Sequence, residues 1–123
     1  MDTARAVGLV RDDVALGVGR WLPALPGEEL EIGVAGTVDG PSGTPFTTVQ
    51  WVHRGRNEGP RDPFIGLAPT GAEVEVHGVT LVEDRGGDEP LFHRYVDWVG
   101  VFDQLGLAVS GRLHVSGHPG HLD

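Results

Sequence analysis

A carboxylate stands in an unusual setting at residues 91–107, "LFHRYVDWVGVFDQLGL". Asp97 lies in a run of apolar and aromatic residues, with Tyr95 and His93 two and four positions before it. Burying a carboxylate among such groups is costly unless it is paired or used, and it raises the carboxyl pKa toward neutrality, where the group can act as a general base. An Asp that ends a strand before a glycine-containing turn also commonly accepts backbone N–H bonds, which is the structural alternative.

The composition excludes several other kinds of chemistry. The chain has 123 residues, 18 acidic against 9 basic, and a formal net charge of −9, which is the wrong sign for a nucleic-acid partner. It has neither lysine nor cysteine, so it offers no Schiff base, thiol nucleophile or disulfide. No apolar run is long enough for a membrane helix, and we expect a cytoplasmic protein with a single domain over residues 1–123.

Four segments alternate apolar and polar residues between turns rich in glycine and proline, and we predict each to be a strand. All connections except 55–71 are short enough for hairpins, so the expected order is an antiparallel meander. Parity places Leu91, His93, Tyr95 and Asp97 on one face of the last strand. The predicted strands span residues 28–38, 44–54, 72–84 and 91–99.

Helix is expected to be scarce. Asp12 and Asp13 suit a helix N-terminus, which predicts one short helix within residues 11–25. Residues 101–107 are predicted to form a further turn, and "RLHV" near the C-terminus to add an edge strand. The tail histidines His114, His118 and His121 do not lie on a helix that would align them, so no metal site is expected there.

Two motifs carry a resemblance to a known family. The segment "FIGLAPTGAEVEVHGVTLVED" contains G-x-x-PTG leading into a strand, and Asp97 is followed seven residues later by Gln104 in "QLG". Together they resemble the SnoaL-like polyketide cyclases and ester cyclases of the NTF2-like superfamily, over roughly residues 28–107. The resemblance implies an α+β fold, an NTF2-like cone with a curved antiparallel sheet, here with a reduced N-terminal helical part.

The resemblance also implies a reaction. In that family the Asp is general base and acid in an intramolecular aldol closure that needs no cofactor or metal. Asp97 would take the proton, and donors would stabilise the enolate oxygen that develops. The expected catalytic residues are Asp97, His93, Tyr95 and His53. The expected substrate-binding residues are Trp51, Phe64, Trp21 and Leu81.

The function expected from the resemblance is therefore cyclisation, or a related rearrangement, of a polyketide-type small molecule in bacterial secondary metabolism such as antibiotic biosynthesis. Two alternatives remain open. One is a non-catalytic ligand-binding or accessory subunit, and the other is an epoxide hydrolase of the limonene-epoxide-hydrolase type. The short N-terminal region predicts an open apolar surface, which favours a homodimer or a covering partner subunit.

Overall fold

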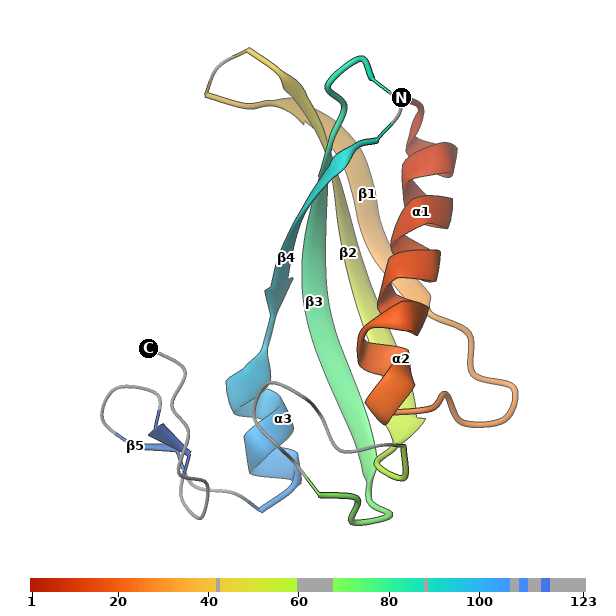
Figure 1. Cartoon of the computed structure of the whole chain (residues 1–123), viewed down its shortest axis with the longest axis vertical. Coiled ribbons are helices and arrows are strands. Elements are labelled where there is room, and N and C mark those ends of the chain that lie inside the picture. Colours follow the sequence, from red (N-terminus) through yellow and green to blue (C-terminus); the bar gives the residue numbers. More distant parts are fainter. Residues whose placement is uncertain (42, 60–67, 88, 107–108, 111–113, 116–123) are drawn as a thin grey trace.

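The chain folds into a curved sheet with helices at one face, as shown by a computed structural model (Figure 1). The structure describes residues 1–41, 43–59, 68–87, 89–106, 109–110 and 114–115. The expected α+β class is confirmed, with an N-terminal helix and a four-stranded open antiparallel sheet. The elements are α1 (Thr3–Leu16), α2 (Val18–Trp21), β1 (Glu31–Asp39), β2 (Pro45–Arg56), β3 (Glu73–Glu83), β4 (Leu91–Val96), α3 (Trp98–Gln104), β5 (Val109–Ser110) and β6 (His114–Val115).

The sheet is the predicted meander, with strand order β1-β2-β3-β4 and every pair antiparallel. One row of the register runs from Trp51 to Gly78 to Val96. The register of β1 shifts between Ile32 and Ala35, so this edge strand carries an irregularity of the kind that twists an edge away from further pairing. The alternation of apolar and polar residues thus predicted the strands, and the short connections between them predicted their order.

Helix was expected within residues 11–25, where the structure has α2 and the end of α1, but the first helix begins well before that range. The helix begins at Thr3 rather than in the region of Asp12, because Asp2 caps it by accepting a hydrogen bond from the Arg5 backbone N–H at 2.7 Å. Its buried residues are Ala6, Val10 and Val14, which recur every four residues and form one apolar stripe. The helical stretch therefore lies earlier in the chain than the acidic pair suggested.

The C-terminal part of the chain also differs from prediction. The last strand of the sheet ends at Val96 rather than at residue 99, because Asp97 begins α3 there. The "RLHV" segment does not extend the main sheet, since β6 pairs with β5 in a separate two-stranded sheet. The region expected to form a further turn, 101–107, begins within α3, which ends at Gln104.

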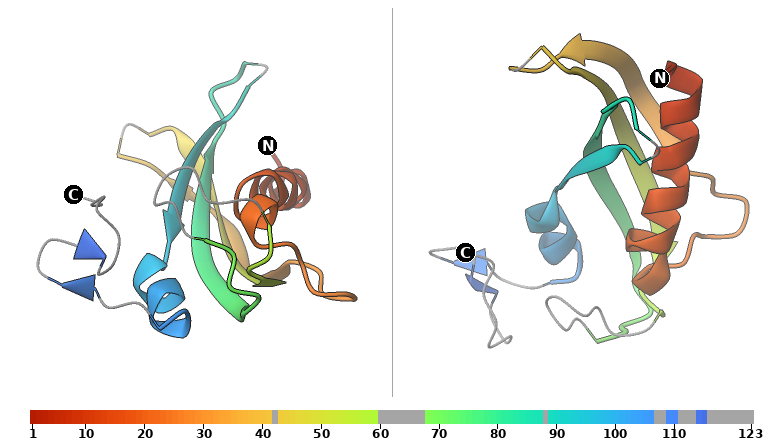
Figure 2. Two further views of the ribbon diagram at one scale, coloured as in Figure 1. Left: turned by 60° about the horizontal axis from the view of Figure 1, so that its bottom comes forward. Right: turned by 45° about the horizontal axis from the view of Figure 1, so that its top comes forward.

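The two faces of the sheet are different in character. The face that α1 covers, which we call the inner face, carries the apolar core (Figures 1 and 2). On the opposite, outer face the side chains of β2 and β3 are half-buried or exposed. The buried core residues are Ala6, Val10, Val14, Val18, Trp21, Leu22, Val49, Trp51, Val74, Val76, Val82, Val101 and Phe102.

Aromatic side chains pack on the inner face of the sheet. Trp51 is 2% exposed, donates its indole N–H to the Thr80 hydroxyl at 3.0 Å, and lies over Gly78, where any Cβ would overlap its ring. Trp98 stacks on Trp21 at a centroid distance of 5.9 Å, which joins α3 to α2. The inner face is therefore a packed core at this position.

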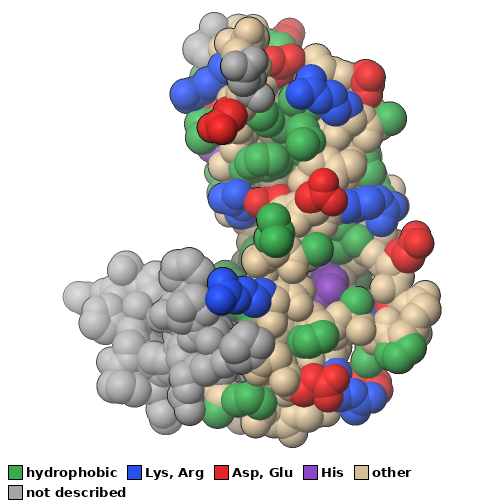
Figure 3. Space-filling view, turned by 45° about the vertical axis from the view of Figure 1, so that its right-hand side comes forward, with side chains coloured by type: hydrophobic (Ala, Val, Ile, Leu, Met, Phe, Trp, Pro, Cys, Tyr) green, Lys and Arg blue, Asp and Glu red, His purple; other side chains and the backbone are tan. Residues whose placement is uncertain are grey.

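An ion pair joins the first helix to the far edge of the sheet. Arg94 on β4 donates from its Nε and Nη2 atoms to both carboxylate oxygens of Asp13 on α1, at 2.7 and 2.6 Å. Its guanidinium carbon lies 5.3 Å from the centre of the Phe92 ring. On the face of the molecule shown in Figure 3, acidic and basic side chains are intermixed rather than gathered by sign.

Candidate functional site

A hollow of about 320 Å³ lies on the outer face, where β4 ends beside β3. It includes Asp97 and Tyr95, two of the residues expected to act in proton transfer. The hollow is shallow and broadly open to solvent. The residues that line it are Gln50, His77, Gly78, Val79, Tyr95, Val96 and Asp97.

Asp97 is held at the rim of this hollow by two backbone hydrogen bonds. Its backbone N–H donates to the His77 carbonyl at 2.9 Å, which continues the β3–β4 ladder by one residue. Its Oδ1 accepts the Gly100 N–H at 2.9 Å and so caps α3. The capping role considered from the sequence is therefore present. Within the described part of the chain, its Oδ2 has no hydrogen-bond partner and the residue is exposed.

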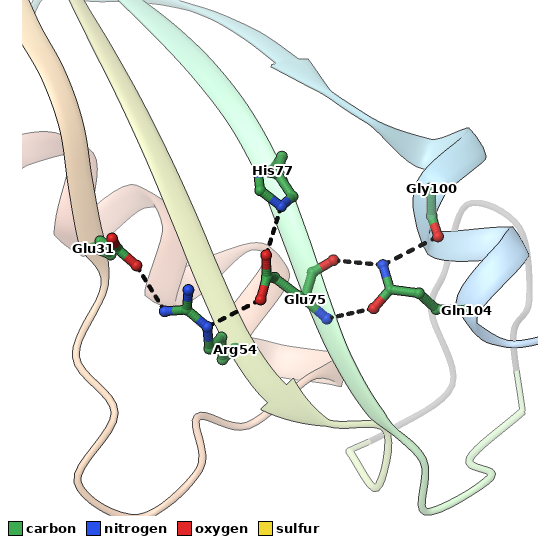
Figure 4. Close-up of polar contacts among 6 residues, drawn as sticks. All are labelled: Glu31, Arg54, Glu75, His77, Gly100 and Gln104. Carbon is green, nitrogen blue, oxygen red and sulfur yellow. Dashed lines mark hydrogen bonds and ion pairs between the residues drawn. The ribbon is translucent and has the colours of Figure 1, made fainter.

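His77 lies beside Asp97 on the neighbouring strand and ends a chain of charged side chains (Figure 4). Its Nε2 donates to Glu75 at 2.7 Å, Arg54 donates to Glu75 at 3.1 Å, and the same guanidinium reaches Glu31 at 2.8 Å. The His77 hydrogen bond, followed by that of Arg54, lowers the pKa of Glu75, although partial burial opposes the shift. A fixed carboxylate thus positions the His77 ring.

Gln104 explains why an Asp and a Gln occur seven residues apart. Its side-chain amide accepts from the Glu75 N–H and donates to the Glu75 carbonyl, both at 2.7 Å, as a neighbouring strand would (Figure 4). The same amide also donates to the Gly100 carbonyl at 3.1 Å. Asp97 caps the start of α3 and Gln104 fastens its end to β3, so the spacing equals the length of this helix.

The PTG segment also has a structural basis. Asn57, 2% exposed, donates from its side-chain amide to the Ala68 carbonyl and the Thr70 hydroxyl, at 3.2 and 3.1 Å. Its carbonyl accepts the N–H groups of Thr70 and Gly71. Gly71 adopts φ +74°, a conformation that favours glycine. The segment that leads into β3 is therefore organised around one buried amide.

The four expected catalytic residues are not brought together. Tyr95, 62% exposed, lies with Asp97 at the hollow. His93 shares their face but bonds to Glu83 at 3.3 Å and packs edge-on against Phe46. His53 lies on the inner face, 6% exposed, and donates its Nε2–H to the Leu22 carbonyl at 2.7 Å. The sheet itself separates His53 from Asp97.

The four expected substrate-binding residues are also scattered. Trp51 and Trp21 are buried in the inner core. Leu81 is half-buried on the outer face, opposite His93 in the register. Phe64 lies outside the described residues. None of the three described residues lines the hollow.

Sequence reasoning did not assign His77 and Gln50 to the site. Both alternate correctly for the face that carries Asp97, and the register brings β3 against β4 so that His77 neighbours Asp97. The sequence signal that could have assigned His77 to the site was the alternation along residues 72–84, combined with the register of that strand against β4. The sequence supplied the parity but left open which face was covered.

The described residues include no group of three or more His, Cys, Asp or Glu side chains that is arranged to hold a metal ion. Among these same residues there is no helix that is both long and apolar enough to span a membrane. Comparison of the chain with protein-family models, curated proteins and solved structures found no match. The hollow and its wall residues are therefore the basis for a functional assignment.

Proposed function

We propose that this chain is a SnoaL-like domain that binds a small molecule in the outer-face hollow and uses Asp97 for acid–base chemistry. The observation that carries the proposal is the convergence of Asp97, Tyr95 and His77 on one hollow of about 320 Å³. A carboxylate, a phenol and an imidazole beside apolar surface are the groups that proton transfer at carbon requires. The resemblance of two sequence motifs to those of the SnoaL-like polyketide cyclases supports the same proposal.

In this proposal each wall residue has a distinct role. Asp97 removes a proton from a carbon next to a carbonyl, through the oxygen that does not cap α3. Tyr95 donates a hydrogen bond to the enolate oxygen as charge develops on it. Asp97 then returns the proton at the new position, so the enzyme ends unchanged. His77, oriented by Glu75, positions the ligand beside Asp97.

Substitution of Asp97 tests this role without removing the helix cap. Asparagine is as good an N-cap as aspartate, so Asp97→Asn keeps α3 while removing the base. Small 1,3-dicarbonyl compounds are incubated in D₂O, and the loss of their acidic C–H signals is followed by NMR. We expect the native chain to accelerate exchange, Asp97→Asn to exchange at the buffer rate, and the exposed control Asp103→Asn to behave as the native chain does.

A non-catalytic binding protein is the second candidate, and the exposure of Asp97 and its service as a helix cap favour it. Binding of these compounds at the hollow without faster exchange would establish that alternative and overturn the catalytic proposal. The epoxide-hydrolase alternative is tested by incubating small epoxides with the same three proteins and following the loss of the epoxide by NMR. The cytoplasmic location stays a prediction, as does the homodimer or partner subunit, which sedimentation equilibrium would test.

A further inference from the structure

The hollow has a one-sided electrostatic character. The polar side chains that line it are a carboxylate, a phenol, an amide and an imidazole, and among the described lining residues there is no arginine. Arg54 belongs to the hydrogen-bonded chain that ends at His77, and it is already shared between Glu31 and Glu75. Its pKa is raised, chiefly by the hydrogen bond to Glu31. Arg54 is therefore engaged with its own carboxylates.

An acceptor of the hollow remains available. His77 uses its Nε2–H on Glu75, so this N–H is not free to donate to a ligand. The lowered pKa of Glu75 keeps that residue anionic behind the ring. Among the described residues, Asp97 Oδ2 is without a donor. Among the described residues, the only charged side chain that lines the hollow is therefore the Asp97 carboxylate.

We infer that the hollow selects a ligand with a cationic ammonium or amidinium group on a small apolar body. This inference rests on the proposed function, since it concerns the ligand of the same site. The cation lies beside the Asp97 carboxylate and the exposed ring of Tyr95, and the apolar body lies on Val79. The net charge of −9 attracts such a ligand and repels carboxylates of the same shape.

Three probes of one shape separate charge from size: benzylamine, benzyl alcohol and benzoate. Binding to the full chain at pH 7 is measured by NMR, from shifts of the backbone amides around the hollow. We expect benzylamine to bind about fivefold more tightly than benzyl alcohol, as an exposed ion pair with a cation–π contact allows. Benzoate should bind most weakly.

Two variants assign the preference to the hollow. Asp97→Asn should reduce the ratio of benzylamine to benzyl alcohol affinity to near one. Gln50→Lys places a cation on the opposite wall, away from the α3 cap, and should reverse the order in favour of benzoate. The control Asp103→Asn has the same charge change as Asp97→Asn but lies outside the hollow, and should keep the native preference.

The outcomes distinguish this inference from the proposed function. Equal binding of benzylamine and benzyl alcohol at the hollow, unaffected by Asp97→Asn, would overturn the cationic preference and leave a small-molecule site in place. Shifts from all three probes that map away from the hollow would overturn the site itself.

Discussion

The two faces of the sheet are formed by the same strands but differ in burial and in the kinds of side chain that they carry. Along β2 and β3 every second residue is buried on the inner face, and these residues include Val49, Trp51 and Val76. The outer face of the same strands carries Gln50, Arg54 and His77 and the hollow. Trp51 and His77 lie on adjacent strands, one residue apart in the register, yet Trp51 is in the core and His77 is exposed at the hollow.

This contrast separates stability from function. Substitutions on the inner face are expected to change the free energy of unfolding, because they create or fill space in a packed core. Substitutions on the outer face should change ligand binding or pH response with little effect on the fold.

The largest effect is expected for Trp51→Ala. Removing this 2%-exposed side chain leaves a cavity between the sheet and its cover and an unpaired Thr80 hydroxyl, so unfolding should become about 3–5 kcal/mol easier. The outer-face counterpart Tyr95→Ala, 62% exposed, should cost less than about 1 kcal/mol. Urea denaturation followed by circular dichroism measures both. Similar losses for the two variants would contradict the division between the faces.

Gly78→Ala tests the closeness of packing at the same point. A Cβ at this position overlaps the Trp51 ring, which is itself buried, so we expect destabilisation of about 1–3 kcal/mol. Gly36→Ala on β1 is the matched control, because a Cβ there meets nothing within 4 Å. That variant should be neutral or slightly stabilising in the same denaturation measurement. A neutral Gly78→Ala would show that Trp51 has room to move.

Asp97 provides the third comparison, between capping and chemistry. Asp97→Ala removes the acceptor of the Gly100 N–H and should cost about 1 kcal/mol, whereas Asp97→Asn should cost much less. Both variants remove the carboxylate, so both should lose the benzylamine preference. Thermal unfolding and ligand titration are measured on the same samples. If both variants were equally destabilised, the carboxylate charge rather than the cap would be the stabilising feature.

Much of the sheet was predictable because strand alternation encodes it directly. The predicted range 72–84 became Glu73–Glu83, and the expected hairpins produced the observed order. The coverage of the faces was not predictable, because both faces of β3 carry apolar residues, Val76 on one and Leu81 on the other. Only the packing of α1 chooses between them, and parity contains no information about it.

The site was predictable in part for the same reason. Asp97 and Tyr95 share the hollow because they share strand parity, whereas His53 was wrongly grouped with them because a neighbouring strand has two faces. His77 required the register of β3 against β4, which depends on where each hairpin turns. A role for Asp97 in accepting backbone N–H bonds was weighed from the sequence, but for the end of a strand before a turn and not for the start of a helix.

The smallest predicted effect concerns pH and the outer face alone. The pKa of Glu75 is lowered below its ordinary value of 4.5, chiefly by the His77 hydrogen bond. A carboxyl group whose pKa is lower in the folded state stabilises the fold above its unfolded pKa, and this contribution is lost as pH falls through the folded value. Native protein should therefore be more stable than Glu75→Gln near neutrality, and the difference should shrink at acidic pH.

His77→Ala identifies the cause of this shift, since it removes the strongest hydrogen bond to Glu75 and leaves Arg54 in place. The pKa of the Glu75 carboxyl, followed by NMR of its side-chain carbon, should rise toward its ordinary value in this variant. The contribution of Glu75 to stability near neutrality should then be smaller, and its loss on acidification should end at higher pH than in the native chain. A wild-type Glu75 that titrates at 4.5 would show that His77 and Glu75 are not coupled. In that case Glu75 would not hold the imidazole in one orientation at the wall of the hollow.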